Sequence, residues 1–131
     1  MQKQVNAALL ALQGARNSIY EATITLSDGT NMPIDLSGAT AARMQVKNTY
    51  TSPAIFTLTE TANANGSVLG APTAQGTIDI TIAQADMALV STSTSGFVDC
   101  VWDLLVIDIH GNPIGYVGGV FRIFTGVTSP S

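Results

Sequence analysis

The side chains that could do acid–base, nucleophilic or metal chemistry are few in this 131-residue chain. There is one histidine, His110, and one cysteine, Cys100, and three aspartates lie near them: Asp99, Asp103 and Asp108. A metal site, a catalytic dyad or a carboxylate pair needs such groups to converge. Whether they converge depends on the elements that carry these five side chains.

Those elements are predicted to be the two strands of a β-hairpin. Residues 97–109 and 114–125 are long and apolar, and the four residues between them have the composition of a turn. His110 is therefore expected in a solvated turn, without a catalytic partner. Cys100 falls on the face expected to point inward, where it packs as a small hydrophobic residue. As the only cysteine, it excludes an internal disulfide and a thiolate zinc site.

The aspartates are not expected to form a catalytic pair either. Asp99 and Asp103 share one strand face but lie about 13 Å apart at the usual rise, too far for a glycosidase pair within one strand. Asp108 faces the other way. We expect Asp103 to form a structural ion pair with Arg122 on the neighbouring strand. Since the chain also lacks a Gly-x-Ser-x-Gly motif, the sequence predicts no catalytic residue, no cofactor and no metal site.

Composition and charge argue against further classes. The net charge is −4, and the five basic residues never cluster, which argues against nucleic-acid binding. The apolar run from Val5 to Leu12 is too short to span a membrane. Apolar residues make up 46% of the chain and charged residues only 11%, against about 25% charged in ordinary domains. So little charge predicts either a surface partly covered by another protein or a neutral surface rich in Ser, Thr, Asn and Gln.

The rest of the chain has the pattern of an all-β sandwich or barrel. Alternation predicts strands at 18–26, 40–47, 54–60 and 76–82, a short strand at 67–69 and one helical turn within 83–91. Asp28-Gly29 is a tight-turn dipeptide, and Gly118-Gly119 predicts a bulge or a close backbone approach. We divide the chain into an N-terminal arm or first strand at 1–16, a sandwich domain at 17–128 and a tail at 129–131.

Residues 33–47, PIDLSGATAARMQVK, are a polar turn followed by a half-buried strand. Asp35 and Ser37 can hydrogen-bond exposed amides, and Leu36 is expected to anchor the turn in the core. Gly38 is expected to permit the bend. The strand that follows alternates apolar residues with Arg43, Gln45 and Lys47, which predicts a cationic outer face.

The C-terminal hairpin also predicts an interaction surface. One face of its first strand is apolar, as expected for a core, but the other face is largely apolar too. We therefore expect a partner to cover this second face, or else a loop or the N-terminal segment to fold over it. The candidate interface residues are Val101, Leu105, Ile107, Ile109, Phe121 and Ile123.

Taken in order, these segments resemble a family of small Ig-like β-sandwich modules encoded among the tail, baseplate and fibre genes of double-stranded DNA bacteriophages. The resemblance covers about residues 14–128. Its marks lie at Asp28–Gly38, Arg43–Lys47, Ile82–Met87, Trp102–Gly111 and Gly119–Ile123. The chain departs from the family's commoner residues at Trp102, Lys47 and Met87, where Tyr, Arg and Thr are usual.

The resemblance implies an Ig-like antiparallel β-sandwich and a non-enzymatic structural part of the virion, in the tail, baseplate or fibre-attachment apparatus. It implies other virion proteins and further copies of the chain as partners, with assembly in the host cytoplasm. Two alternatives stay open: a capsid decoration or head-fibre protein, and a carbohydrate-binding module for a host-surface glycan. For the carbohydrate-binding module, the candidate stacking residues are Tyr20, Tyr50, Trp102 and Tyr116.

Overall fold

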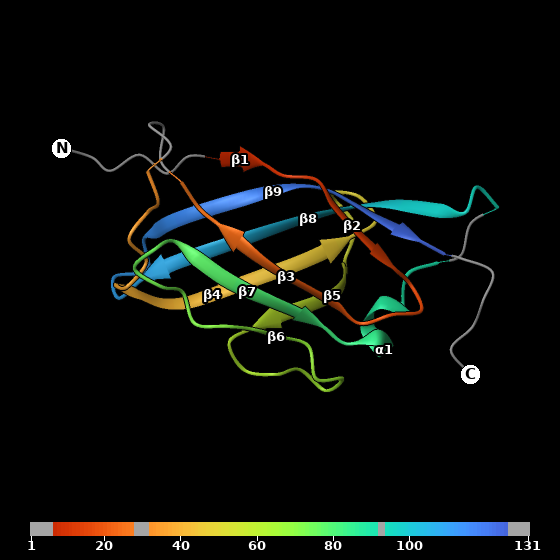
Figure 1. Ribbon diagram of the computed structural model, residues 1–131, viewed down its shortest axis with the longest axis horizontal. Coiled ribbons are helices and arrows are strands. Elements are labelled where there is room, and N and C mark those ends of the chain that lie inside the picture. Colours follow the sequence, from red (N-terminus) through yellow and green to blue (C-terminus); the bar gives the residue numbers. More distant parts are fainter. Residues whose placement is uncertain (1–6, 28–31, 92–93, 126–131) are drawn as a thin grey trace.

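Two β-sheets pack face to face around one apolar core, so the predicted all-β sandwich is confirmed (Figure 1). The computed structural model describes residues 7–27, 32–91 and 94–125; the predicted Asp28-Gly29 turn and the tail at 129–131 lie outside them. In chain order the elements are β1 (Ala7–Leu9), β2 (Leu12–Ala15), β3 (Tyr20–Thr25), β4 (Ala39–Lys47), β5 (Ala54–Thr59), β6 (Val68–Leu69), β7 (Thr77–Ile82), α1 (Gln84–Met87), β8 (Phe97–Asp108) and β9 (Pro113–Phe124).

The larger sheet has the predicted C-terminal hairpin, β8 and β9, at its centre. Its strand order is β1–β9–β8–β4–β5, with β2 also pairing β9, and the smaller sheet has the order β3–β7–β6. Among the described strands, β1 and β2 run parallel to β9, and the other pairs are antiparallel. The antiparallel arrangement expected from the sequence therefore holds everywhere except at this N-terminal edge.

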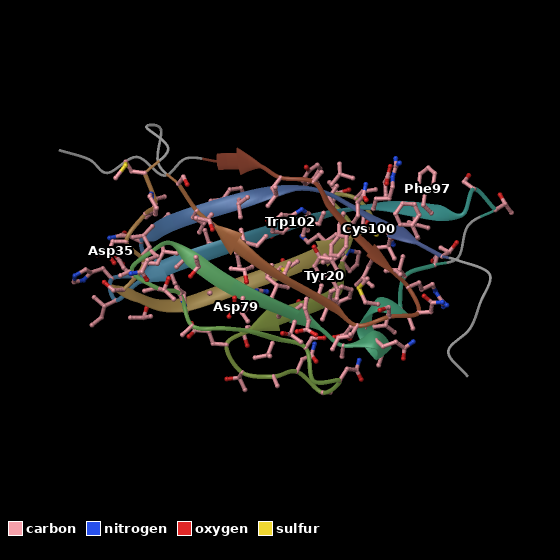
Figure 2. All side chains as sticks on the ribbon, viewed as in Figure 1. Tyr20, Asp35, Asp79, Phe97, Cys100 and Trp102 are labelled. Carbon is pink, nitrogen blue, oxygen red and sulfur yellow. The ribbon has the colours of Figure 1, made fainter. Side chains whose placement is uncertain are left out.

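Alternation along the strands decides which side chains form the core. Ile78, Ile80 and Ile82 point inward from the smaller sheet and are buried. The larger sheet contributes Trp102 and Cys100, which lie inside the sandwich (Figure 2), and its other buried residues include Met44, Val46, Leu104, Val106, Phe121 and Ile123. Fully burying one such large side chain stabilises the fold by about 1.5–3 kcal/mol, so apolar packing is the main source of stability.

The turn before β4 is anchored by the core, as predicted. Leu36 is fully buried, and its backbone N–H donates to the carbonyl of Thr73. The N–H of Ser37 donates to Oδ1 of Asp35 at 2.9 Å. The prediction for Gly38 is wrong, because its φ is not positive and a Cβ added there would meet no atom within 4 Å. The bend therefore does not depend on glycine at this position.

The N-terminal segment forms two strands of the larger sheet. Between β1 and β2, the backbone of Leu10 lies against the glycine pair of β9. Its N–H donates to the carbonyl of Gly118 at 2.9 Å, and its carbonyl accepts from Nε1 of Trp102 at 3.0 Å. A Cβ at Gly119 would lie 2.5 Å from the Leu10 carbonyl oxygen. The backbone of Leu10 therefore approaches the glycine pair closely, as the sequence predicts.

A buried carboxylate fastens the long loop after β5 to α1. Asp86 is 2% exposed and accepts hydrogen bonds from Nδ2 of Asn63, Nδ2 of Asn65 and Oγ of Ser67. Burial alone would raise the pKa of Asp86, but these three hydrogen bonds together outweigh it and hold the pKa below its usual value. These hydrogen bonds join two segments of the chain, so Asp86 and its partners have a structural role.

Candidate functional site

His110 and Cys100 occupy different parts of the C-terminal hairpin. His110 is exposed in the hairpin turn, where its backbone N–H donates to Oδ1 of Asp108. Cys100 is buried, and burial, followed by the charge of Asp99, raises the pKa of its thiol. Among the described residues, no three His, Cys, Asp or Glu side chains are grouped so that they could hold a metal ion.

The ion pair of the hairpin involves a different aspartate from the predicted one. Register places Asp99 opposite Arg122 and Gly118 opposite Asp103. Both carboxylate oxygens of Asp99 accept from Arg122, at 2.7 Å from Nε and 2.9 Å from Nη2, and these hydrogen bonds lower the pKa of Asp99. The guanidinium of Arg122 also lies 3.9 Å from the ring centroid of Phe97. The prediction that Arg122 pairs with Asp103 is wrong.

The outward side chains of β4, β8 and β9 form a surface that we call the outer large face. Because residues opposite each other in a sheet point to the same side, the register assigns its rows. These rows are Lys47–Val101–Val120, Gln45–Asp103–Gly118, Arg43–Leu105–Tyr116 and Ala41–Ile107. Apolar and charged side chains therefore alternate across this face, and neither kind covers it alone.

Four of the six predicted interface residues lie on this face or at its end. Leu105 is 37% exposed, Ile109 in the hairpin turn is 77% exposed, and Val101 and Ile107 are half-buried. Phe121 and Ile123 are fully buried in the core, so the prediction of an interface role is wrong for these two.

The outward residues of β9 that sequence reasoning missed are Val120 and Phe124, which are 44% and 42% exposed. They alternate with the buried pair Phe121 and Ile123, and Arg122 lies between them on the outward side. A charged residue in a strand usually lies on the solvent side. Arg122 could therefore have indicated which residues of β9 point outward and which point into the core.

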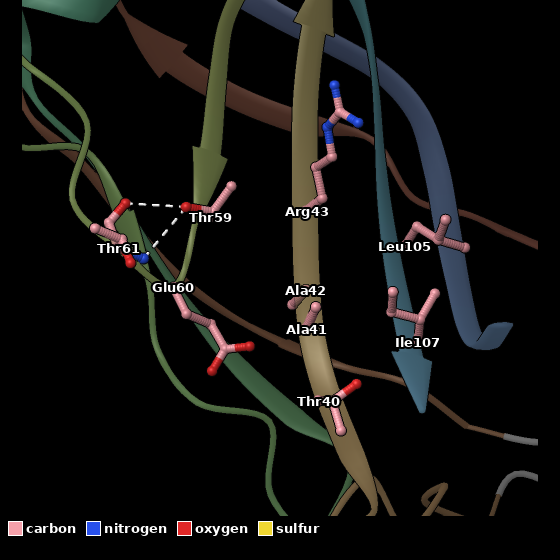
Figure 3. Close-up of a pocket in the computed structure, with 9 residues that line it drawn as sticks. All are labelled: Thr40, Ala41, Ala42, Arg43, Thr59, Glu60, Thr61, Leu105 and Ile107. Atoms are coloured by element: carbon pink, nitrogen blue, oxygen red, sulfur yellow. Dashed lines mark hydrogen bonds between the residues drawn. The ribbon is translucent and has the colours of Figure 1, made fainter. Parts of the chain in front are cut away.

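A hollow of about 370 Å³ lies in the outer large face, and Figure 3 shows the side chains that line it. Leu105 and Ile107 form its apolar side, and the small side chain of Ala41 leaves room between them and the loop after β5. Glu60 lies on that loop side and Arg43 at one end. Within the described part of the chain, neither charge makes a hydrogen bond or an ion pair. The hollow therefore presents apolar contact area with two unpaired charges of opposite sign.

A smaller hollow of about 60 Å³ lies farther along the same face. It is lined by Gln45, Lys47, Tyr50, Val101, Trp102 and Asp103. Of the four aromatic candidates, Trp102 is buried and Tyr20 packs on Phe121 with ring centroids 4.9 Å apart. Tyr50 is 69% exposed and Tyr116 half-buried, so these two are the aromatic side chains that remain near the surface.

The outer face of the smaller sheet is different in kind. It carries Glu21, Thr23, Asp79 and Thr81, and Oγ1 of Thr23 donates to Oδ1 of Asp79 at 2.7 Å. Such hydroxyl and carboxylate groups are well solvated and offer no apolar contact area. The two outer faces therefore divide the molecule into a solvated side and an amphipathic side.

No protein-family model matches this chain, and no curated protein matches it in sequence. In the part of the chain that the structure describes, no helix has the length and apolar character that crossing a membrane requires. The functional argument therefore rests on the surfaces of the sandwich.

Proposed function

We propose that this chain is a non-enzymatic structural protein of a double-stranded DNA bacteriophage virion, in the tail, baseplate or fibre-attachment apparatus. It acts through protein–protein interfaces, its partners are other virion proteins and further copies of itself, and it is assembled into the virion in the host cytoplasm. This role uses no cofactor, no nucleic acid and no membrane.

The observation that carries the proposal is the amphipathic character of the outer large face. Leu105 and Val120 are exposed in the middle of this face, although both could have been polar without loss to the core. Arg43 and Glu60, unpaired within the described residues, flank the larger hollow. Interfaces between proteins combine apolar contact area with charges that select the partner.

The resemblance to phage modules gives independent support, because its marks fall on parts with an architectural role. The turn mark at Asp28–Gly38 includes the buried anchor Leu36, and the mark at Trp102–Gly111 covers most of β8 and the hairpin turn. The mark at Arg43–Lys47 is the cationic part of β4 on the outer large face. The marked residues therefore include parts of the core and of the outer large face.

The first test is the mass of the purified full chain by light scattering over a concentration series. We expect an oligomer with the wild-type chain and a shift to the monomer with Leu105→Asp, which replaces apolar contact area with a carboxylate that must be desolvated in the contact. The matched control is Thr25→Asp, on the outer face of the smaller sheet, which should leave the mass unchanged. A wild-type monomer at every concentration would contradict self-association.

The second test is mass spectrometry and immunogold labelling of particles of the phage that encodes the chain. Label on the tail, baseplate or fibre attachment supports the proposal, and absence of the chain from purified particles overturns it. Label on the capsid surface would replace it with the alternative, a decoration or head-fibre protein.

A further inference from the structure

Tyr50 is presented to solvent by an ordered turn. Its ring is 69% exposed, yet the turn around it is closed by two hydrogen bonds. The N–H of Ser52 donates to the carbonyl of Thr49 at 3.1 Å, and the hydroxyls of Thr49 and Ser52 are 2.6 Å apart. An exposed aromatic ring on such a backbone can bind a ligand without a large ordering cost.

The hollow beside Tyr50 combines one apolar side chain with spare hydrogen-bonding groups. Val101 lies beside three polar side chains, and Trp102 also borders the hollow although its own side chain is buried in the core. The carboxylate of Asp103 accepts one hydrogen bond, at 3.3 Å from the Tyr116 hydroxyl, and has room for further donors. The side-chain ammonium of Lys47 makes no hydrogen bond or ion pair within the described residues. The third side chain, Gln45, donates to Oγ1 of Thr57 at a long 3.4 Å.

The surroundings leave this hollow open. Register places Gly118 opposite Asp103, so no side chain of β9 covers the carboxylate from that position. Tyr116 lies next to the hollow, and burial, followed by the charge of Asp103, raises the pKa of its phenol, with a smaller contribution from Tyr50. Tyr50 and Asp103 both line the hollow, and Asp103 accepts from Tyr116, so the two tyrosines lie in one region of the surface.

We propose that the hollow of Tyr50, Gln45, Lys47 and Asp103 is a saccharide subsite that takes one neutral hexopyranose unit of a glycan. The apolar C–H face of the sugar stacks on the Tyr50 ring. Its hydroxyls donate to the carboxylate of Asp103 and accept from the ammonium of Lys47. A pyranose is larger than the hollow of about 60 Å³, so the ring lies over it with one exocyclic group inserted.

Two features favour a neutral sugar over other ligands that stack on aromatic rings. The chain carries a net charge of −4 and no basic cluster, which disfavours nucleotides. The carboxylate of Asp103 and the ammonium of Lys47 have opposite charges, so the hollow has no net charge that would select an acidic or a basic sugar. The inference goes beyond the proposed virion role and does not depend on it. Because Lys47 and Asp103 belong to the outer large face, a partner that covers this part of the face would compete with the sugar.

The test is a titration of the ¹⁵N-labelled full chain with methyl glucoside, galactoside and mannoside, followed by amide chemical shifts. A ligand of this size on one open aromatic ring should bind with a Kd of about 1 mM. We expect saturable shifts at Tyr50, Lys47 and Asp103 with at least one sugar. Tyr50→Ala should weaken binding roughly tenfold through loss of stacking. Leu89→Ala removes an exposed apolar side chain outside the hollow and should have no effect.

Asp103→Asn is a second variant, which keeps the stacking ring and removes the charged acceptor. It should weaken binding without changing which amides shift. Absence of saturable shifts with all three sugars up to roughly 50 mM overturns the proposal, and so do shifts that Tyr50→Ala leaves unchanged. Light scattering of Tyr50→Ala separates the two proposals: its mass should match the wild type whatever the sugar titration shows.

Discussion

At the scale of single residues, Gly119 is a position where the backbone of another segment leaves no room for a side chain. Its φ is +157°, and a Cβ there would meet the carbonyl oxygen of Leu10 at 2.5 Å. Gly119→Ala must therefore push the N-terminal segment away from β9, and we expect a loss of roughly 2–4 kcal/mol in the free energy of unfolding. Urea denaturation monitored by Trp102 fluorescence measures it.

Gly38→Ala is the matched control for this prediction. The added methyl group would meet nothing within 4 Å, and the backbone is not in the positive-φ region. Reduced freedom of the unfolded chain should make this variant as stable as the wild type or slightly more stable. Equal losses in the two variants would contradict the contact of Leu10 with Gly119.

Asp86 should make the free energy of unfolding depend on pH in the acidic range. Its pKa is below the usual 3.8 in the folded chain, so its contribution is complete above that value and is lost as the pH falls through the folded value. Asp86→Asn brings an amide against donors from Asn63 and Asn65, and we expect it to cost roughly 1–3 kcal/mol at neutral pH. Urea denaturation from about pH 6 to about pH 2.5 should show a shallower acid loss in this variant than in the wild type.

The control for acid dependence is Asp79→Asn, on the outer face of the smaller sheet. Asp79 is exposed and accepts from Thr23, so its loss should leave the acid dependence of the wild type largely in place. If Asp86→Asn and the wild type lost the same free energy between the two pH values, the hydrogen bonds to Asp86 would not be the cause.

At the scale of elements, the N-terminal strands are attached through the backbone of Leu10. Leu10→Pro removes the N–H that donates to Gly118, so β1 and β2 should lose their pairing with β9 while the rest of the sandwich stays folded. We expect a loss of roughly 1–3 kcal/mol. Hydrogen exchange should show fast amides at Gln13 and Gly14 with slow amides retained in β8.

Leu10→Ala separates the backbone effect from the side-chain effect. The Leu10 side chain is 40% exposed, and alanine keeps the N–H, so this variant should exchange like the wild type. Fast exchange at Gln13 in both variants would show that the side chain, and not the hydrogen bond to Gly118, holds the strand.

The elements were predictable where one face of a strand is buried, because alternation then specifies the structure. The strands from 18–26 to 76–82, the helical turn and the hairpin all followed from this signal. The pairing of Arg122 with Asp99 did not follow from this signal. A turn at residues 110–113 places position 122 opposite Val101, and Asp99 and Asp103 lie two residues to either side. The structure closes the turn from Asp108 to Asn112 and shifts the register by one residue between Val106 and Ile107, and the two together place Arg122 opposite Asp99.

Parallel pairing of β1 and β2 with β9 was beyond sequence reasoning for another reason. The partners are separated by more than a hundred residues, and no short turn links them. In the sequence, the contact site of Leu10 could be recognised only as the pair Gly118-Gly119. This pair predicts a close backbone approach but does not indicate which segment makes it. The same holds for the candidate site, where the sequence indicated Leu105 and Tyr50 separately but not the hollows beside them.

At the scale of the whole molecule, the sandwich has one solvated side and one amphipathic side. The smaller sheet presents Glu21 and Asp79 to water, whereas the outer large face exposes Leu105 and Val120 beside Arg43. With a net charge of −4, copies of the chain repel each other weakly at long range. The proposed self-association would therefore depend on short-range contact of the outer large face.

This balance makes the salt dependence of association a test of its physical origin. Salt screens the repulsion between copies and does not weaken apolar burial, so raising it from about 50 mM to about 500 mM should preserve or strengthen association of the wild type. Leu105→Asp should stay monomeric at both concentrations, because its added charge must be desolvated in the contact. Light scattering of both proteins gives the answer. Association that falls steeply with salt would mean that pairs between Arg43 and Glu60 of neighbouring copies dominate, and that the apolar residues of the outer large face are secondary.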